Sequence, residues 1–287
     1  MGLVNIIKRK IVLLSLTLIV GYLNAQPDTV GVTQLRRGEN RIANLLVEGE
    51  LLLKTNPDNA LDFGLQALVL AKNQGQVQDE AAALNLLAEA NFALLQLENA
   101  LRYYNRSLTI YEKLNQKDNQ IKTYIGLSKV YDTAKNPELA IQYLERANSL
   151  IDDNVSINLQ IELKLYLGFI YQKQGSYRSS IVTYGKVLEK LDKASSQKVK
   201  NRDKIRINCY IQIGQSEKNS GELDKSLISF KNAASYAISS KDTLRYTTSL
   251  RELALSFYLL QELDSAFQNF SLSYSLSKTI ADTLGMI

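Results

Sequence analysis

The sequence predicts an all-α protein built as a solenoid of about six helical hairpins with a 40-residue period. Three observations predict this fold. A small residue recurs in steps of 40, 40, 40, 46 and 40, at Ala60, Ala100, Ala140, Ser180, Ser226 and Ala266. A second small residue lies twelve positions before each copy after the first, at Ala88, Ser128, Gly168, Gly214 and Ala254. Only three prolines, the strongest helix breakers, occur in 287 residues.

The fourth copy, residues 163–191, indicates how one unit folds. Its first helix is predicted from an apolar stripe at helical spacing: Leu163, Leu167, Ile170 and Tyr171. A second stripe follows after the turn predicted at Gly175: Ile181, Tyr184, Val187, Leu188 and Leu191. Gly168 lies inside the first helix, where glycine costs about 1 kcal/mol relative to alanine. We therefore expect it to allow a close approach of the second helix.

These units resemble the tetratricopeptide repeat (TPR). The family signature W-x2-L-G-x2-Y…A-x3-F is matched by Leu167, Gly168, Tyr171, Ser180 and Tyr184. The first copy matches least, with Glu48 and Gly64 at the small and aromatic places, as expected of a terminal unit. The resemblance covers about residues 40–280. It implies a right-handed α-solenoid in which the first helices of successive units line a concave groove.

The repeat also predicts the domain boundaries. A linker is expected at 26–39, and the array at 40–280 divides into units at about 41–79, 80–118, 119–156, 157–202, 203–242 and 243–280. Residues 281–287 are interpreted as the start of a truncated seventh unit, because Asp282-Thr283-Leu284 repeats Asp242-Thr243-Leu244. The period exceeds the family's 34 residues by about six. We place these extra residues in polar connections between units, such as 115–120, 152–156, 239–243 and the longest, 192–204.

Residues 1–25 have the pattern of a Sec-type signal peptide. Three positive charges at positions 8–10 precede ten uncharged residues, and Ala25 follows at a suitable cleavage position. The pattern predicts an exported protein, with the periplasm as the expected location. A secreted protein and an uncleaved N-terminal membrane anchor are the alternatives, and the anchor would be the chain's only contact with a membrane.

Composition excludes several classes of chemistry. The chain has no histidine and a single cysteine, Cys209, so histidine-based catalysis and a Cys/His zinc site are excluded. Three of the 34 basic residues lie in the first ten positions, and the rest exceed the 29 acidic residues by only two. This balance does not predict a nucleic-acid partner. We predict no catalytic residue, no cofactor and no metal site, and therefore no enzyme.

The resemblance places the candidate binding residues on the exposed face of each first helix, at the position after the small residue and its helical neighbours. These residues are Asn85, Glu89, Phe92, Ile125, Lys129, Leu165, Phe169, Gln172, Ile211, Gln215, Arg251, Leu255 and Tyr258. Packing against neighbouring helices is the equally weighted alternative. The Lys, Arg and Asn cluster with which chaperone-binding members hold a terminal carboxylate is interrupted by Leu165 and Phe169.

The predicted function is a non-catalytic scaffold that binds a protein or peptide in this groove. The alternative is the N-terminal sensor region of a signal-transduction protein, separated from its output domain. The array resembles the exported TPR sensor regions of bacterial membrane histidine kinases and related transcription regulators.

Overall fold

The computed structural model describes residues 41–195 and 198–284, with side chains up to Thr279. This part of the chain forms twelve α-helices and no strand, which confirms the predicted all-α solenoid. The helices are α2 (Arg41–Leu52), α3 (Pro57–Gln74), α4 (Val77–Ala93), α5 (Leu97–Lys113), α6 (Lys117–Thr133), α7 (Pro137–Ser149), α8 (Ile157–Lys173), α9 (Tyr177–Lys193), α10 (Arg202–Asn219), α11 (Leu223–Ser239), α12 (Thr243–Leu259) and α13 (Leu263–Leu284).

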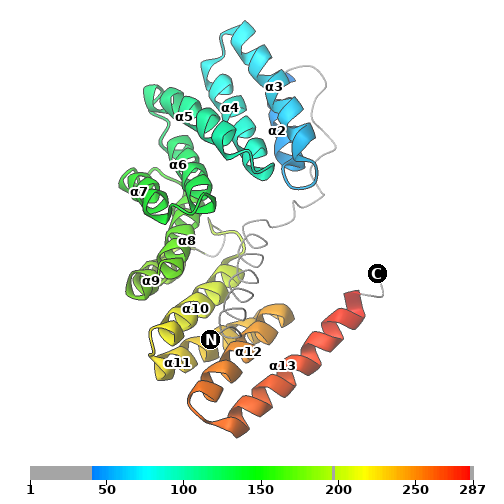
Figure 1. Cartoon of the computed structure of the whole chain (residues 1–287), viewed down its shortest axis with the longest axis vertical. Helices are drawn as coiled ribbons and strands as arrows, with labels where there is room; N and C mark the ends of the chain where they lie inside the picture. Colours follow the sequence, from blue (N-terminus) through cyan, green and yellow to red (C-terminus); the bar gives the residue numbers. More distant parts are fainter. Residues whose placement is uncertain (1–40, 196–197, 285–287) are drawn as a thin grey trace.

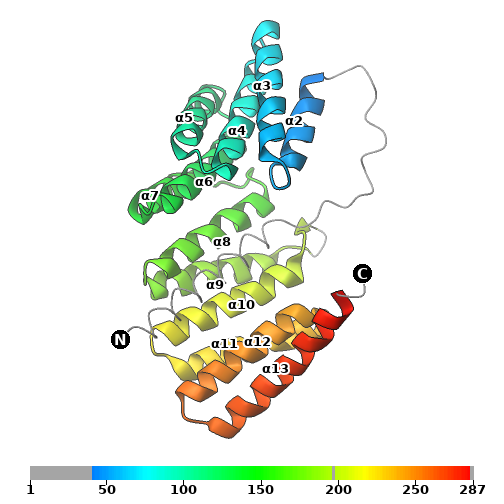
Figure 2. The same ribbon diagram turned by 45° about the vertical axis from the view of Figure 1, so that its right-hand side comes forward.

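The helices stack as successive hairpins, from α2–α3 to α12–α13, and together they form a curved array (Figures 1 and 2). Each helix packs on the next one in the chain. The first helices of neighbouring hairpins, α4, α6, α8, α10 and α12, also contact one another in sequence. We therefore call their solvent-facing surface the inner face of the array.

The residues that lengthen the repeat lie mostly in the helices. Seven of the helices have 17 residues each, and the turns between them, such as 114–116 and 240–242, have three. The predicted polar connections at 115–120 and 239–243 are therefore too long. In sequence, the polar residues of an exposed first helical turn resemble those of a loop, because neither an exposed helical turn nor a loop needs apolar side chains. True connections occur at 150–156, after the short helix α7, and at 194–201.

The turns inside the five hairpins from α4–α5 to α12–α13 share one geometry. Leu95, Lys135, Gly175, Gly221 and Gln261 all have positive φ, between 59° and 89°. The next amide N–H donates to the carbonyl five residues back, as from Gln96 to Asn91 at 2.8 Å. This is the Schellman arrangement that ends a helix with a left-handed residue, usually glycine. The sequence signal is weak where a residue other than glycine occupies this position.

Leu95→Gly is expected to raise the free energy of unfolding by about 1 kcal/mol, since a side chain costs about that much in the left-handed region. Leu95 is 71% exposed, so its side chain contributes little packing. Denaturant unfolding would measure the change. The matched control is Leu94→Gly, because Leu94 has a φ of −81°. The Leu94→Gly variant should be less stable than the unmodified protein. If Leu95→Gly were destabilised as well, the positive φ of Leu95 would not be costly.

In two of the hairpins the core depends on close contact between a glycine and an aromatic ring. A Cβ atom added to Gly168 would lie 3.0 Å from the ring of Tyr184, and one added to Gly214 would lie 2.6 Å from Phe230. Both rings are buried. The expected close approach at Gly168 is thus present. Gly126, which lies outside the repeat pattern, makes a similar contact with Tyr104.

Several terminal predictions lie outside the described residues or remain predictions. The signal peptide at 1–25 and the linker at 26–39 lie outside them. Helix α13 includes Asp282 to Leu284 without a preceding turn, and the seventh unit, like the unit boundaries, remains a prediction.

No helix in the described part of the chain is long and apolar enough to span a membrane. The predicted periplasmic location also needs correction, for a reason unrelated to membrane-spanning helices. The prediction of an exported, periplasmic protein depended on residues 1–25 alone, which lie outside the described residues. No comparison with known proteins supports export either, so that prediction is wrong as an assignment for this protein.

Candidate functional site

The thirteen candidate groove residues lie on the five first helices α4, α6, α8, α10 and α12, but they differ in exposure. Ile125, Phe169 and Ile211 are buried in the core, and the ring of Phe169 lies 6.0 Å from that of Tyr166. Arg251 and Tyr258 are exposed. The half-buried residues are Asn85, Glu89, Phe92, Lys129, Leu165, Gln172, Gln215 and Leu255. The C-terminal part of the inner face therefore offers the most accessible side chains.

Polar contacts join the first helices at the N-terminal part of this face. The Thr123 hydroxyl of α6 donates a hydrogen bond to Asn85 Oδ1 of α4 at 3.2 Å. The Asn85 amide in turn donates to Glu89 Oε1, also at 3.2 Å. Lys173 Nζ of α8 lies 2.5 Å from Asp132 Oδ1 of α6. These contacts hold neighbouring first helices in register.

The same type of contact continues toward the C-terminus. The Gln172 amide of α8 donates to the Ser216 hydroxyl of α10 at 3.1 Å. Lys218 Nζ of α10 lies 2.6 Å from Glu252 Oε2 of α12, and both side chains are largely buried. Sequence reasoning did not find the partners Lys173 and Glu252, because their separations of 41 and 34 residues follow from helix stacking and not from the repeat alone.

Glu89 is the most perturbed acid of the inner face. Burial raises its pKa to about 7, because desolvation disfavours the charged carboxylate. The ammonium group of Lys129 opposes this shift, whereas the carboxylates of Glu50 and Glu162 add to it. Burial also raises the pKa of Glu50. The N-terminal part of the face therefore changes charge near neutral pH.

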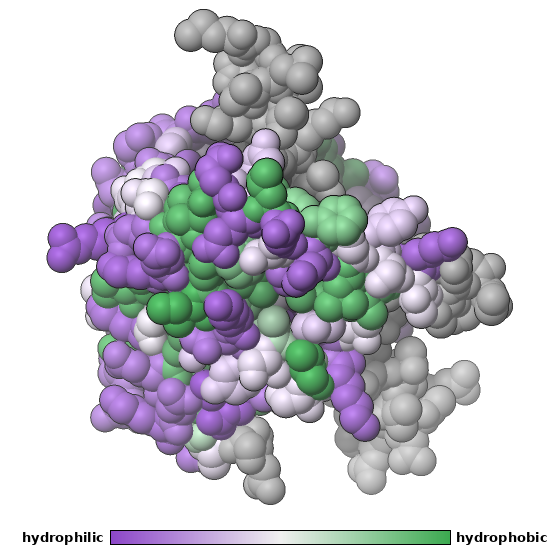
Figure 3. Space-filling model, turned by 90° about the horizontal axis from the view of Figure 1, so that it is seen from below, coloured by the Kyte–Doolittle hydropathy of each residue, from purple (hydrophilic) through white to green (hydrophobic). Residues whose placement is uncertain are grey.

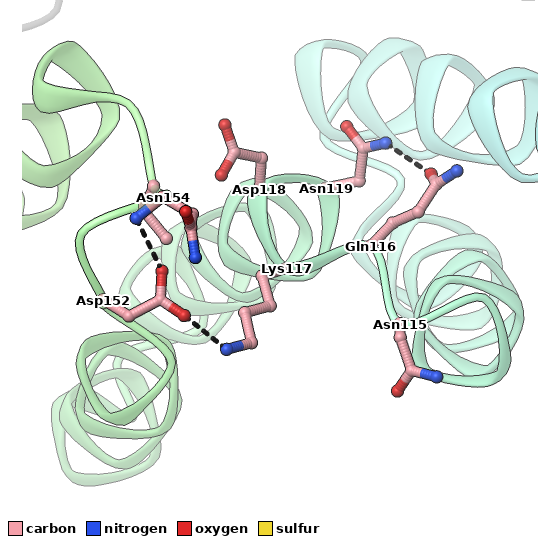
Figure 4. Close-up of a pocket in the computed structure, with 8 residues that line it drawn as sticks. Asn115, Gln116, Lys117, Asp118, Asn119, Asp152 and Asn154 are labelled. Carbon is pink, nitrogen blue, oxygen red and sulfur yellow. Dashed lines mark hydrogen bonds and ion pairs between the residues drawn. The ribbon is translucent and has the colours of Figure 1, made fainter.

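Two open hollows lie at the edge where units are connected, away from the candidate residues. The first encloses about 400 Å³ between the α5–α6 turn and the α7–α8 connection. Figure 4 shows Lys117 and Asp152 pointing toward each other across it, with 2.5 Å between Nζ and Oδ2. Hydrogen bonds from Lys117 and from the Asn154 amide lower the pKa of Asp152. The second hollow, of about 360 Å³, lies between 199–204 and the α11–α12 turn.

In the first hollow, Lys117 and Asp152 already pair with each other. In the described ranges, no group of His, Cys, Asp or Glu residues is placed to hold a metal ion. Cys209 is fully buried, which raises the pKa of its thiol and disfavours the reactive thiolate. The inner face, with its graded exposure, is therefore the better candidate for binding.

Comparisons with known proteins agree with the repeat fold. A family model described as tetratricopeptide repeat matches residues 79–149. No curated protein matches the chain. Among solved structures, BtubC from P. vanneervenii is 13% identical with a TM-score of 0.64, and the match covers 85% of this chain and 93% of that one.

Two further structures are similar in fold. A signal transduction ATPase with numerous domains and a TPR sensor, from Pyrococcus horikoshii, has a TM-score of 0.67 at 18% identity. The match covers 80% of this chain but only 34% of that protein. Aspartyl phosphate phosphatase F from Bacillus subtilis has a TM-score of 0.56 at 14% identity, with 84% and 61% of the two chains covered.

The family match, the repeat signature and the stacked hairpins agree with one another. The resemblance to histidine-kinase sensor regions has no support among the comparisons, whereas the repeat family does. Residues 79–149 therefore belong to the tetratricopeptide-repeat family, and the hairpins on either side of them share its fold.

Proposed function

We propose that this protein is a non-catalytic scaffold that binds a peptide or a peptide-like segment of a partner protein along the inner face. TPR arrays generally serve as surfaces for protein–protein interaction. The observation that carries the proposal is the exposure of the inner face toward α12, where Arg251 and Tyr258 are exposed beside the half-buried Leu255. Apolar and cationic groups together suit a peptide that has apolar side chains and acidic or carbonyl oxygens.

Contacts between the first helices support this proposal. Because Lys218 is paired with Glu252, and Gln172 with Ser216, the backbone beneath the face is held in one arrangement. A surface that is already ordered loses less conformational entropy when it binds. One guanidinium nitrogen of Arg251, Nη2, lies 3.8 Å from Glu252 Oε1. The other N–H groups of the Arg251 guanidinium are available to a ligand.

The test is a selection of random displayed peptides on the full chain, followed by calorimetric titration of the selected peptides. A Leu255→Glu, Tyr258→Glu double variant should weaken their binding at least tenfold, because it places negative charge on the apolar contact surface. Both side chains are accessible enough to change without opening the core. Phe169 is unsuitable for this purpose, since it is 8% exposed.

The matched control is Ile228→Glu, on the second helix α11, because Ile228 is 61% exposed and lies off the inner face. This variant should bind the selected peptides like the unmodified protein. Equal binding by all three proteins would contradict the assignment of the inner face, as would a selection that returns no peptide.

A sensor role is the second candidate, and the similarity to the signal transduction ATPase from Pyrococcus horikoshii, which has a TPR sensor, favours it. In a sensor, binding would change the curvature of the array. Spin labels on Val69→Cys in α3 and Ile238→Cys in α11 would report this change, since both positions are exposed. A distance that shifts when a selected peptide binds favours the sensor, and an unchanged distance favours the rigid scaffold.

A further inference from the structure

Helix α13 has an apolar stripe that the described elements leave largely exposed. Leu263, Phe267, Phe270 and Tyr274 follow one another at helical spacing and therefore share one face. Phe267 is 73% and Tyr274 is 74% exposed. Figure 3 looks onto the end of the array formed by α12 and α13, and hydrophobic residues gather there in patches among polar ones. Contiguous exposed apolar surface of this kind marks an interaction site.

The same face is covered in the earlier second helices. Phe230 of α11, which occupies the place of Phe270, is 0% exposed, whereas Phe270 is 36% exposed. Phe267 corresponds to Leu227, which is buried. The helices α5, α7, α9 and α11 each pack against the first helix of the following unit. The stripe of α13 therefore has the shape and chemistry of a surface that packs against another helix.

The charged residues of α13 indicate which helix could pack on the stripe. No charged residue lies between Asp264 and Lys278, so the stripe does not repel a copy of itself. Ser271 lies midway between these two residues and is small. If two α13 helices cross antiparallel at Ser271, Asp264 of each copy lies opposite Lys278 of the other. A parallel pair would instead bring like charges together.

We propose that the stripe is a homodimer interface, in which α13 packs antiparallel on α13 of a second copy around Ser271. The contact is isologous and closes on itself, so it yields a dimer and not a filament. The two inner faces stay uncovered, because the stripe lies on a second helix. The dimer would present two binding faces to partners.

Sedimentation of the full chain over a range of concentrations is the first test, with a dimer as the expected result. Phe267→Glu and Tyr274→Glu should each raise the dimer dissociation constant at least tenfold, because each buries a charge at the interface. Ile228→Glu, at an apolar position of α11 that is 61% exposed, should leave the dimer dissociation constant unchanged. A monomer at every concentration, or a dimer unaffected by Phe267→Glu, would overturn the proposal.

Two further variants test the arrangement. Ser271→Cys should form a disulfide between the copies under mild oxidation, and the buried Cys209 should not interfere. Val47→Glu tests the alternative in which α13 packs on the exposed face of α2 in another copy, where Val47 is 43% exposed. It should leave the dimer intact. Loss of association in Val47→Glu, or no cross-link at Ser271→Cys, would overturn the antiparallel dimer.

Discussion

The Gly214→Leu variant is expected to lose about 2–3 kcal/mol of unfolding free energy, because the new side chain overpacks the fifth hairpin. A Cβ at position 214 would already lie 2.6 Å from the Phe230 ring, well inside van der Waals contact. Phe230 is fully buried, and side chains in a close-packed core move little. Calorimetric or denaturant unfolding would measure the loss.

The chain supplies a matched control in Gly185, which also lies inside a helix. Apart from its chain neighbours and the backbone of its own helix, no atom lies within 4 Å of the Cβ that a substitution would add there. Gly185→Ala should therefore stabilise the protein by about 0.5–1 kcal/mol through helix propensity alone. If Gly214→Ala stabilised the protein to the same extent, the close contact between Gly214 and Phe230 would not limit the packing.

The Glu89→Gln variant is expected to be more stable than the unmodified protein by about 3 kcal/mol at pH 8, and to lose that advantage near pH 4. The pKa of Glu89 is raised from 4.5 to about 7 in the folded state, mainly by burial. The folded protein therefore holds this proton more tightly than the unfolded chain. The contribution of Glu89 to stability falls as pH rises from about 4.5 to about 7 and stays low above that.

Unfolding curves at several pH values would measure this difference. Glutamine keeps the acceptor oxygen for the Asn85 amide, so the hydrogen bond at 3.2 Å is preserved. Glu98→Gln, at an exposed position in the first turn of α5, serves as control and should change stability little at any pH. A difference between Glu89→Gln and the unmodified protein that stays constant from pH 5 to 8 would contradict the assignment.

The repeat made the fold predictable, because each unit must bury its apolar stripes against its neighbours. Small residues such as Gly168 and Gly214 mark the helix crossing directly, since a larger residue would collide with Tyr184 or Phe230. The connections were less predictable. Lys117 and the residues after it are polar because they form an exposed helix start, and polarity alone does not separate this case from a loop.

The sequence placed the candidate residues on one side of the first helices, but it did not predict how exposed each of them is. Helical spacing placed Phe169 beside Leu255 in one pattern, but Phe169 packs on Tyr166 whereas Leu255 stays half-buried. The exposure of a side chain depends on the angle between neighbouring helices. The spacing of residues within one helix does not determine that angle. The ion pair of Lys218 with Glu252 has the same origin, as it joins two units across 34 residues.

The length of the first helices sets the width of the inner face. A helix of 17 residues, such as α8 or α12, spans about 25 Å at about 1.5 Å per residue. An extended peptide that lies along one such helix would need about seven or eight residues, at about 3.3 Å each, to cross the array. A peptide of three or four residues would touch only half of this width. Partners of this array are therefore expected to present longer segments than a short terminal motif.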